Sequence, residues 1–259
     1  MSISELRRAL DPVAFAAHAG LSDPDPWQRD LLRSDAPRVL LNCSRQAGKS
    51  TTAALLALHK ARYTPGSLVL LLAPTLRQSQ EFFAKVATAL NRVEGGRARL
   101  RRGGFADRDA VRRLGLELAN SSRIEALPGS EKTVRGFSGV DLLILDEASR
   151  IDDGLYHAVR PMLAVSGGRL MVLSTPWGKR GVFFEEWANG EGWERYEVPA
   201  TKVPRISSEF LEEERRALGE RWFRQEYLCS FEETDDSMFA SDAIEKALDP
   251  TIAPLFGSS

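Results

Sequence analysis

Residues Arg38–Ser50 read Arg-Val-Leu-Leu-Asn-Cys-Ser-Arg-Gln-Ala-Gly-Lys-Ser, an apolar run followed by a polar loop. A buried strand, then a loop, then the start of a helix is the context in which a phosphate-binding loop (Walker A) works. Backbone N–H groups of such a loop surround the β-phosphate of a nucleotide, Lys49 reaches the β- and γ-phosphate oxygens, and the Ser50 hydroxyl ligates Mg²⁺. We therefore predict that ATP and Mg²⁺ bind at a loop made of Ser44, Arg45, Gln46, Ala47, Gly48, Lys49, Ser50 and Thr51.

One position of this loop departs from the usual pattern. Cys43 stands where the first glycine of a Walker A motif belongs. The alternative interpretation is a chance Gly-Lys-Ser at the start of a helix, so a second motif has to decide between the two.

That second motif is an apolar strand, Leu142–Leu145, which ends in Asp146 and Glu147. At the end of a core strand, Asp146 would complete the Mg²⁺ shell, and Glu147 would orient and polarise the attacking water as in a Walker B motif. An acidic N-cap of a following helix is the alternative. Because the two motifs complete one metal site, together they favour a catalytic ATPase.

The apolar runs also predict the fold class. None alternates with period two, as expected for strands that are buried on both faces, and helical stretches separate the first of them. Strand and helix in alternation indicate an α/β protein with a mostly parallel sheet flanked by helices. The predicted strands are 38–42, 67–73, 140–145 and 169–174, the predicted helices are 48–62 and 76–93, and a hairpin is predicted from 114–118 and 123–127.

Composition excludes several other classes of protein. Of the 259 residues, 43% are hydrophobic and 27% are charged, values typical of a folded domain rather than a disordered or coiled-coil chain. The net charge of −1 means that a nucleic-acid partner would have to meet a local basic patch. With only Cys43 and Cys229, we expect a reducing, intracellular setting, and no run approaches the length of a membrane span.

Three polar residues outside the two motifs are further candidates. Ser174 and Thr175 follow the predicted strand 169–174 and could sense the γ-phosphate, although a plain exit from strand to turn is equally consistent. The Gln28 amide could pair with adenine N6 and N7, but a glutamine before a strand is usually a surface residue.

The ordered set of motifs resembles the ATPase region of the large terminase subunit of tailed bacteriophages, a RecA-like P-loop NTPase, over nearly the whole chain. In that family the loop often lacks its first glycine and carries an Arg-Gln pair. The loop of this sequence likewise has Cys43 in place of that glycine and contains Arg45-Gln46. The motifs that carry the resemblance are Trp27-Gln28, Arg45–Ser50, Ala73-Pro74-Thr75, Leu145–Ala148, Ser174-Thr175-Pro176 and Trp222–Cys229.

The resemblance implies a motor that hydrolyses ATP to translocate double-stranded DNA into a procapsid in the cytoplasm of an infected bacterium. It implies a homo-oligomeric ring, pentameric when assembled, that works with a portal protein and a small terminase subunit and with no membrane. A helicase-like DNA-dependent ATPase and a non-hydrolysing nucleotide-binding scaffold are the alternatives. The expected organisation is a helical preface (1–35), an ATPase core (36–178), a small helical lid (179–230) and a linker (231–259) towards an absent nuclease domain, so we expect no DNA cleavage.

The arginines divide into two groups. Arg135 precedes Gly136 at a position that matches the family's arginine finger, while Arg45 could lie against the phosphates of its own subunit. A surface-loop arginine is the alternative for Arg135. The segment 92–113 contains eight arginines and three acidic residues, and it could contact the DNA backbone or be a solvated loop.

Overall fold

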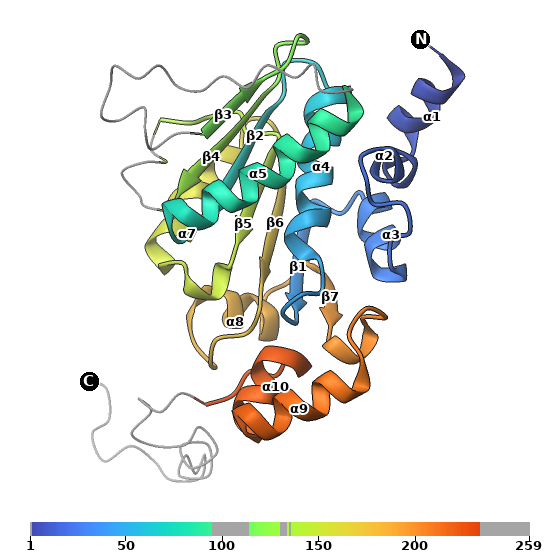
Figure 1. The fold of residues 1–259 in the computed structure, drawn as a ribbon. Helices are drawn as coiled ribbons and strands as arrows, with labels where there is room; N and C mark the ends of the chain where they lie inside the picture. The colour runs from blue at the N-terminus through green and yellow to red at the C-terminus, as the bar shows by residue number, and fades with distance from the viewer. Residues whose placement is uncertain (1, 95–113, 130–133, 135, 234–259) are drawn as a thin grey trace, which may run out of the picture.

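The computed structural model describes residues 2–94, 114–129, 134 and 136–233. Within this part of the chain, seven strands form one sheet in the order β3-β4-β2-β5-β6-β1-β7 (Figure 1). Every neighbouring pair is parallel except β3 and β4, which form the predicted antiparallel hairpin. The expected α/β class is therefore confirmed. The strands are β1 (Arg38–Cys43), β2 (Leu68–Ala73), β3 (Leu114–Glu117), β4 (Arg123–Pro128), β5 (Leu142–Asp146), β6 (Arg169–Ser174) and β7 (Glu194–Val198).

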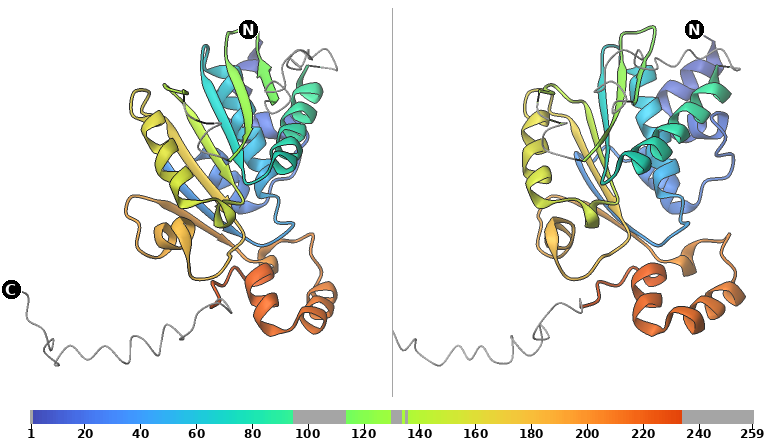
Figure 2. Two further views of the ribbon diagram at one scale, coloured as in Figure 1. Left: turned by 90° about the vertical axis from the view of Figure 1, so that its left-hand side faces the viewer. Right: turned by 60° about the vertical axis from the view of Figure 1, so that its left-hand side comes forward.

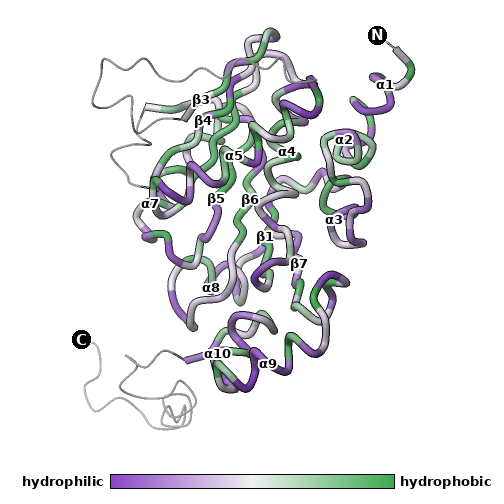
Figure 3. The backbone as a smooth tube through the Cα atoms, in the orientation of Figure 1, coloured by the Kyte–Doolittle hydropathy of each residue, from purple (hydrophilic) through white to green (hydrophobic). Residues whose placement is uncertain are grey.

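Burial explains why the central strands form as predicted. All residues of β2 and β5 are buried, and so are all residues of β1 and β6 after the first. Their side chains are mostly aliphatic, and Figure 3 shows hydrophobic residues concentrated along these strands. Successive side chains of a strand point to opposite faces of the sheet, so these strands bury apolar surface on both faces. They therefore occupy the centre of the sheet.

Helices cover both faces of the sheet (Figure 2). One hydrophobic cluster joins one face to the two long helices α4 (Lys49–Tyr63) and α5 (Leu76–Val93) and to the N-terminal helices. A second cluster joins the other face to α7 (Asp153–Val159) and α8 (Gly181–Ala188). Because β5, β6 and β1 are parallel neighbours, their carboxyl ends lie side by side at one end of the sheet. Ligands bind at this end in open parallel sheets.

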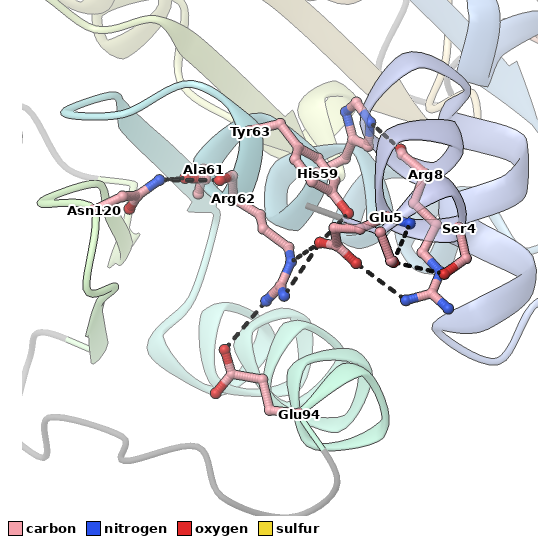
Figure 4. Close-up of polar contacts among 10 residues, drawn as sticks. Ser4, Glu5, Arg8, His59, Ala61, Arg62, Tyr63, Glu94 and Asn120 are labelled. Atoms are coloured by element: carbon pink, nitrogen blue, oxygen red, sulfur yellow. Dashed lines mark hydrogen bonds and ion pairs between the residues drawn. The ribbon is translucent and has the colours of Figure 1, made fainter.

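The N-terminal preface consists of α1 (Ile3–Leu10), α2 (Pro12–His18) and α3 (Pro26–Arg33). No residue of α1 is buried, and polar contacts hold it to the molecule. Figure 4 shows the Glu5 carboxylate, which accepts hydrogen bonds from the Tyr63 hydroxyl at 3.0 Å and from the Arg62 guanidinium at 3.4 Å. Arg62 also pairs with Glu94 at 3.2 Å. One arginine therefore connects α1, α4 and the end of α5.

The segment predicted as a helical lid differs from the prediction in one respect. Glu194–Val198 is strand β7, which pairs in parallel with β1 at the edge of the central sheet. The helices α9 (Ser208–Leu218) and α10 (Glu220–Leu228) do form a small helical layer around Leu211, Phe223 and Tyr227. In the part of the chain that the structure describes, no helix is long and apolar enough to cross a bilayer.

Candidate nucleotide site

The loop between β1 and α4 has the geometry of an anion-binding turn. Gly48 adopts φ +94°, a conformation that side chains rarely allow, and a Cβ there would lie 3.0 Å from Nε2 of Gln28. Helix α4 starts at Lys49, and its N-cap residue, Gly48, has no side chain that could cap the first turn. Its N–H groups are thus left for a ligand, and the helix dipole favours an anionic one.

Lys49 and the two acidic residues at the end of β5 form the charged centre of the site. The Nζ atom of Lys49 lies 3.1 Å from Oε1 of Glu147. Burial by itself would lower the pKa of Lys49, but the carboxylates of Glu147 and Asp146 outweigh it and raise that pKa above its ordinary value. Lys49 therefore stays fully protonated at neutral pH.

Asp146 and Ser50 supply the two oxygen donors expected for a metal. The Asp146 carboxyl is buried, and the nearby Ser50 hydroxyl favours its charged form. Burial raises the pKa of Asp146, and the nearby Lys49 charge partly offsets the increase. A hydroxyl and a carboxylate side by side are hard oxygen ligands of the kind that Mg²⁺ prefers.

Glu147 follows β5 in a left-handed backbone conformation, with φ 53° and ψ 42°. Such a conformation is costly for a non-glycine residue and is found most often at functional sites. The turn separates the two neighbouring carboxylates, because Asp146 stays buried while Glu147 faces a large cavity. The left-handed turn at Glu147 therefore places Asp146 in the protein interior and Glu147 at the cavity.

The cavity measures about 990 Å³ and is open to solvent. The loop residues Arg45–Thr51 form its floor, and Glu147 and Thr175 lie on its wall. Residues Gly20–Asp23, in the turn between α2 and α3, also line the cavity, and so does Gln28 in the first turn of α3. The cavity has the right order of size for a nucleotide.

Several predicted residues have partners within the protein. Ser174 donates to the Ser149 hydroxyl at 2.7 Å and accepts from the Ser149 N–H, and it does not line the cavity. The N–H of Ser44 donates to the Val198 carbonyl, and Ser44 is fully buried. Gln28 accepts from the N–H of Asp25 and donates to the Thr52 hydroxyl, so its amide fixes the start of α3 as well as lining the cavity.

Of the two candidate arginines, Arg45 lies in the part of the chain that the structure describes. Arg45 lines the cavity, and its guanidinium donates to the Glu226 carboxylate of α10. Its backbone N–H also donates to the Glu226 carbonyl, at 3.1 Å. Arg135 lies outside the described residues, and so do residues 95–113, which make up most of the arginine-rich segment 92–113.

Sequence patterns missed the contribution of Arg205. Its guanidinium makes a two-pronged contact with the buried carboxylate of Asp25, at 2.8 and 2.9 Å, and reaches the Ala47 carbonyl at 3.3 Å. It therefore links the segment before α9 to the preface and to the phosphate-binding loop. Nothing in the sequence connects Arg205 to a partner 180 residues away.

Arg150 and two tryptophans form a second missed connection. The Arg150 guanidinium lies 3.9 Å from the centre of the Trp177 ring, and Trp177 packs against Trp222 of α10 at 5.8 Å. Arg150 also lines the cavity. The stack therefore joins the turn after β5, the turn after β6 and α10, all at the nucleotide edge of the sheet.

Comparisons with known proteins agree with one another. The model of the family described as terminase large subunit, T4likevirus-type, N-terminal, matches residues 40–246. The large terminase subunit of Thermus virus P23-45 is 27% identical over 253 residues, which cover 84% of this chain and 50% of that protein. The chain thus spans about half the length of the curated relatives it matches.

Solved structures give the same result. The ATPase domain of the large terminase of Thermus phage P74-26 is 25% identical with a TM-score of 0.66, covering 81% of this chain and 94% of that one. The large terminase of bacteriophage HK97 has a TM-score of 0.67 at 17% identity, covering 89% of this chain and 55% of that one, and therefore shares the fold.

Proposed function

The chain belongs to the family of T4likevirus-type terminase large subunits, N-terminal region, and we propose that it is the ATP-hydrolysing motor domain of a viral DNA-packaging terminase. The observation that carries the proposal is the contact between Lys49 of the phosphate-binding loop and Glu147 after β5, with the buried Asp146 carboxyl and the Ser50 hydroxyl beside them. These are the groups that phosphoryl transfer to water requires: a phosphate cation, a metal-binding pair and a residue that orients the water.

In the proposed mechanism, the phosphates of ATP lie on the free N–H groups at the start of α4. Lys49 exchanges its contact with Glu147 for the β- and γ-phosphate oxygens, because these carry more negative charge than one carboxylate. Glu147 is then free to accept a hydrogen bond from the attacking water and to orient it in line with the γ-phosphorus. Ser50 and Asp146 would hold Mg²⁺, which neutralises charge on the phosphates when bound.

The wider assignments are also proposals. We assign residues 1–35 to a preface, 36–178 to the ATPase core, 179–230 to a lid that also contributes β7, and 231–259 to a linker. The partners are double-stranded DNA, a portal protein, a small terminase subunit and further copies of the chain in a pentameric ring, in the host cytoplasm. Gln28, Ser174 and Thr175 remain predicted nucleotide contacts, and Arg135 remains the predicted trans-acting finger.

Phosphate release in the presence of Mg²⁺ tests the central proposal. Lys49→Ala should abolish turnover and weaken nucleotide binding, since the phosphates lose their buried cation. Stimulation by double-stranded DNA and procapsids would support the motor, whereas binding of ATP by the wild-type chain without turnover would favour the scaffold alternative. That the chain cleaves no DNA stays a prediction, which a plasmid-nicking assay with Mg²⁺ or Mn²⁺ tests.

A further inference from the structure

The nucleotide cavity is lined by more cationic than acidic side chains. Of its described lining residues, five are cationic and three are acidic. Each acid already has a cationic partner: Asp23 pairs with Arg29 at 2.8 Å, Glu81 with Arg77 at 3.1 Å and Glu147 with Lys49 at 3.1 Å. The excess of positive charge is what an anionic ligand requires.

Four of the five cations are also engaged within the protein. Lys49 contacts Glu147, and Arg150 lies over the Trp177 ring. The other two arginines pair with carboxylates on neighbouring elements, Arg45 with Glu226 and Arg205 with Asp25. Among the residues that the structure describes, Lys85 is the cavity cation for which no hydrogen bond, ion pair or ring contact is found. It is thus the cation whose charge is available to a ligand.

The position of Lys85 follows from the register of α5. Gln78, Glu81 and Lys85 are spaced by three and four residues, so they lie on one face of the helix, and all three line the cavity. Glu81 points its carboxylate to Arg77 on its other side and leaves Lys85 unpaired. Helix α5 packs beside α4, which carries Lys49 and Ser50 (Figures 1 and 2).

Lys85 also lies on the side of the site where the metal would bind. It lines the same cavity as Lys49, Ser50 and Glu147, and its positive charge favours the charged form of the buried Asp146 carboxyl. It borders a smaller adjoining cavity of about 300 Å³ as well, together with Thr51 of α4. The γ-phosphate of a nucleotide on the loop would approach Glu147 and Asp146, and Lys85 lines the same cavity as Glu147.

Resting on the proposed function, we propose that Lys85 is a second phosphate-binding cation of this site, which forms an ion pair with the γ-phosphate of a nucleoside triphosphate. Lys49 lies beneath the phosphates at the start of α4, and Lys85 approaches from α5. The Lys85 side chain is exposed, so its contribution is expected to be moderate.

Titration calorimetry with Mg·ATPγS and Mg·ADP tests the assignment in the full chain. Lys85→Met should weaken ATPγS binding about tenfold and ADP binding less than about twofold, the size expected of one charge-assisted contact that only the triphosphate makes. Lys85→Arg should restore most of the difference, and Lys202→Met, at an exposed lysine outside the cavity, should change neither affinity. Thermal unfolding confirms that the variants are folded.

Three results would overturn it. If Lys85→Met binds ATPγS as tightly as the wild type does, Lys85 makes no contact with the nucleotide. If the variant loses equal affinity for ATPγS and ADP, Lys85 does not contact the γ-phosphate. An equal loss in Lys202→Met would show a general effect of charge. If the wild-type chain binds neither nucleotide, the proposed function itself fails, and the assignment of Lys85 fails with it.

Discussion

The Nζ atom of Lys49 and the Oε1 atom of Glu147 lie 3.1 Å apart, across the junction between the loop after β1 and the turn after β5. The proposed phosphate-binding cation and the residue proposed to orient the attacking water therefore neutralise each other's charge. Lys49 is nine-tenths buried, and a buried cation left alone would be costly. In the proposed mechanism, Glu147 thus balances the buried Lys49 charge until phosphates replace it.

This contact makes a prediction for Glu147→Gln. The amide keeps the shape of the side chain but cannot act as a base, so hydrolysis should slow by about 10²–10⁴-fold. Mg·ATP binding should be retained or tightened, because Lys49 no longer has to leave a carboxylate. Single-turnover hydrolysis and calorimetry check the two parts, and a variant that has lost ATP binding would make Glu147 a structural residue.

A second prediction concerns the contact of Arg205 with Asp25. Arg205→Ala leaves the buried Asp25 carboxylate without its cation, so we expect a loss of about 1–2 kcal/mol in the free energy of unfolding, reduced from the value for a fully buried pair because Arg205 is half exposed. Asp25→Asn keeps a capping oxygen for α3. In the double variant the two losses should not add.

Urea unfolding of the four proteins measures this coupling. Fully additive losses would show that the two side chains stabilise the fold independently, despite the distances of 2.8 and 2.9 Å between them.

A third prediction is the pH dependence of α1 docking. Burial raises the pKa of Glu5, but the Tyr63 hydroxyl and the Arg62 charge outweigh it, so the pKa lies below its ordinary value of 4.5. A carboxyl with a lowered pKa in the folded state stabilises that state above its unfolded pKa, and the stabilisation is lost as pH falls through the folded value. The contribution should therefore be complete at neutral pH, and it should be lost as the pH falls below 4.5 and through the lower folded-state pKa.

Glu5→Gln isolates this effect. The melting temperature of the wild type should exceed that of the variant at pH 7, and the difference should shrink as the pH is lowered from 5 to 3. A difference that stays constant over this range would mean that the Glu5 charge does not hold α1.

The parts of the fold that the sequence predicted are those with a strong local signal. Strand β5 is a continuous aliphatic run, and residues buried on both faces leave few alternatives to a central strand. Strand β7 was missed because Glu194, Arg195 and Glu197 are charged and only Val198 is fully buried. It is an edge strand whose pairing with β1 comes from tertiary structure, and charges on such an edge discourage further pairing.

The site shows the same division. Lys49, Ser50, Asp146 and Glu147 belong to contiguous motifs whose spacing has a physical meaning, and the structure brings them together. Ser174 also follows a core strand, but it bonds to Ser149, a residue with no motif of its own. Arg205, Arg150 and Lys85 lie on helices or loops where an arginine or lysine is ordinary, so only their neighbours in space distinguish them.

The last prediction separates the two candidate arginines by the subunit on which each acts. Arg45 lines the cavity of its own chain and bonds to Glu226 of that chain through both its side chain and its backbone, so we predict that it acts on the nucleotide of the same subunit. An arginine finger at Arg135 would instead reach a neighbour's γ-phosphate, and such a finger contributes about 10³–10⁵ in rate. Assembled rings that mix two inactive variants can tell these cases apart.

In rings of Arg135→Ala and Glu147→Gln chains, some interfaces pair an intact finger with an intact base, so activity should return. In rings of Arg45→Ala and Glu147→Gln chains, no site regains both groups if Arg45 acts in cis, and activity should stay low. ATP hydrolysis by rings of verified composition is the measurement, with each variant alone as the control. Recovery in the Arg45 mixture together with none in the Arg135 mixture would reverse the assignment, and would require Arg45 to leave Glu226 when subunits assemble.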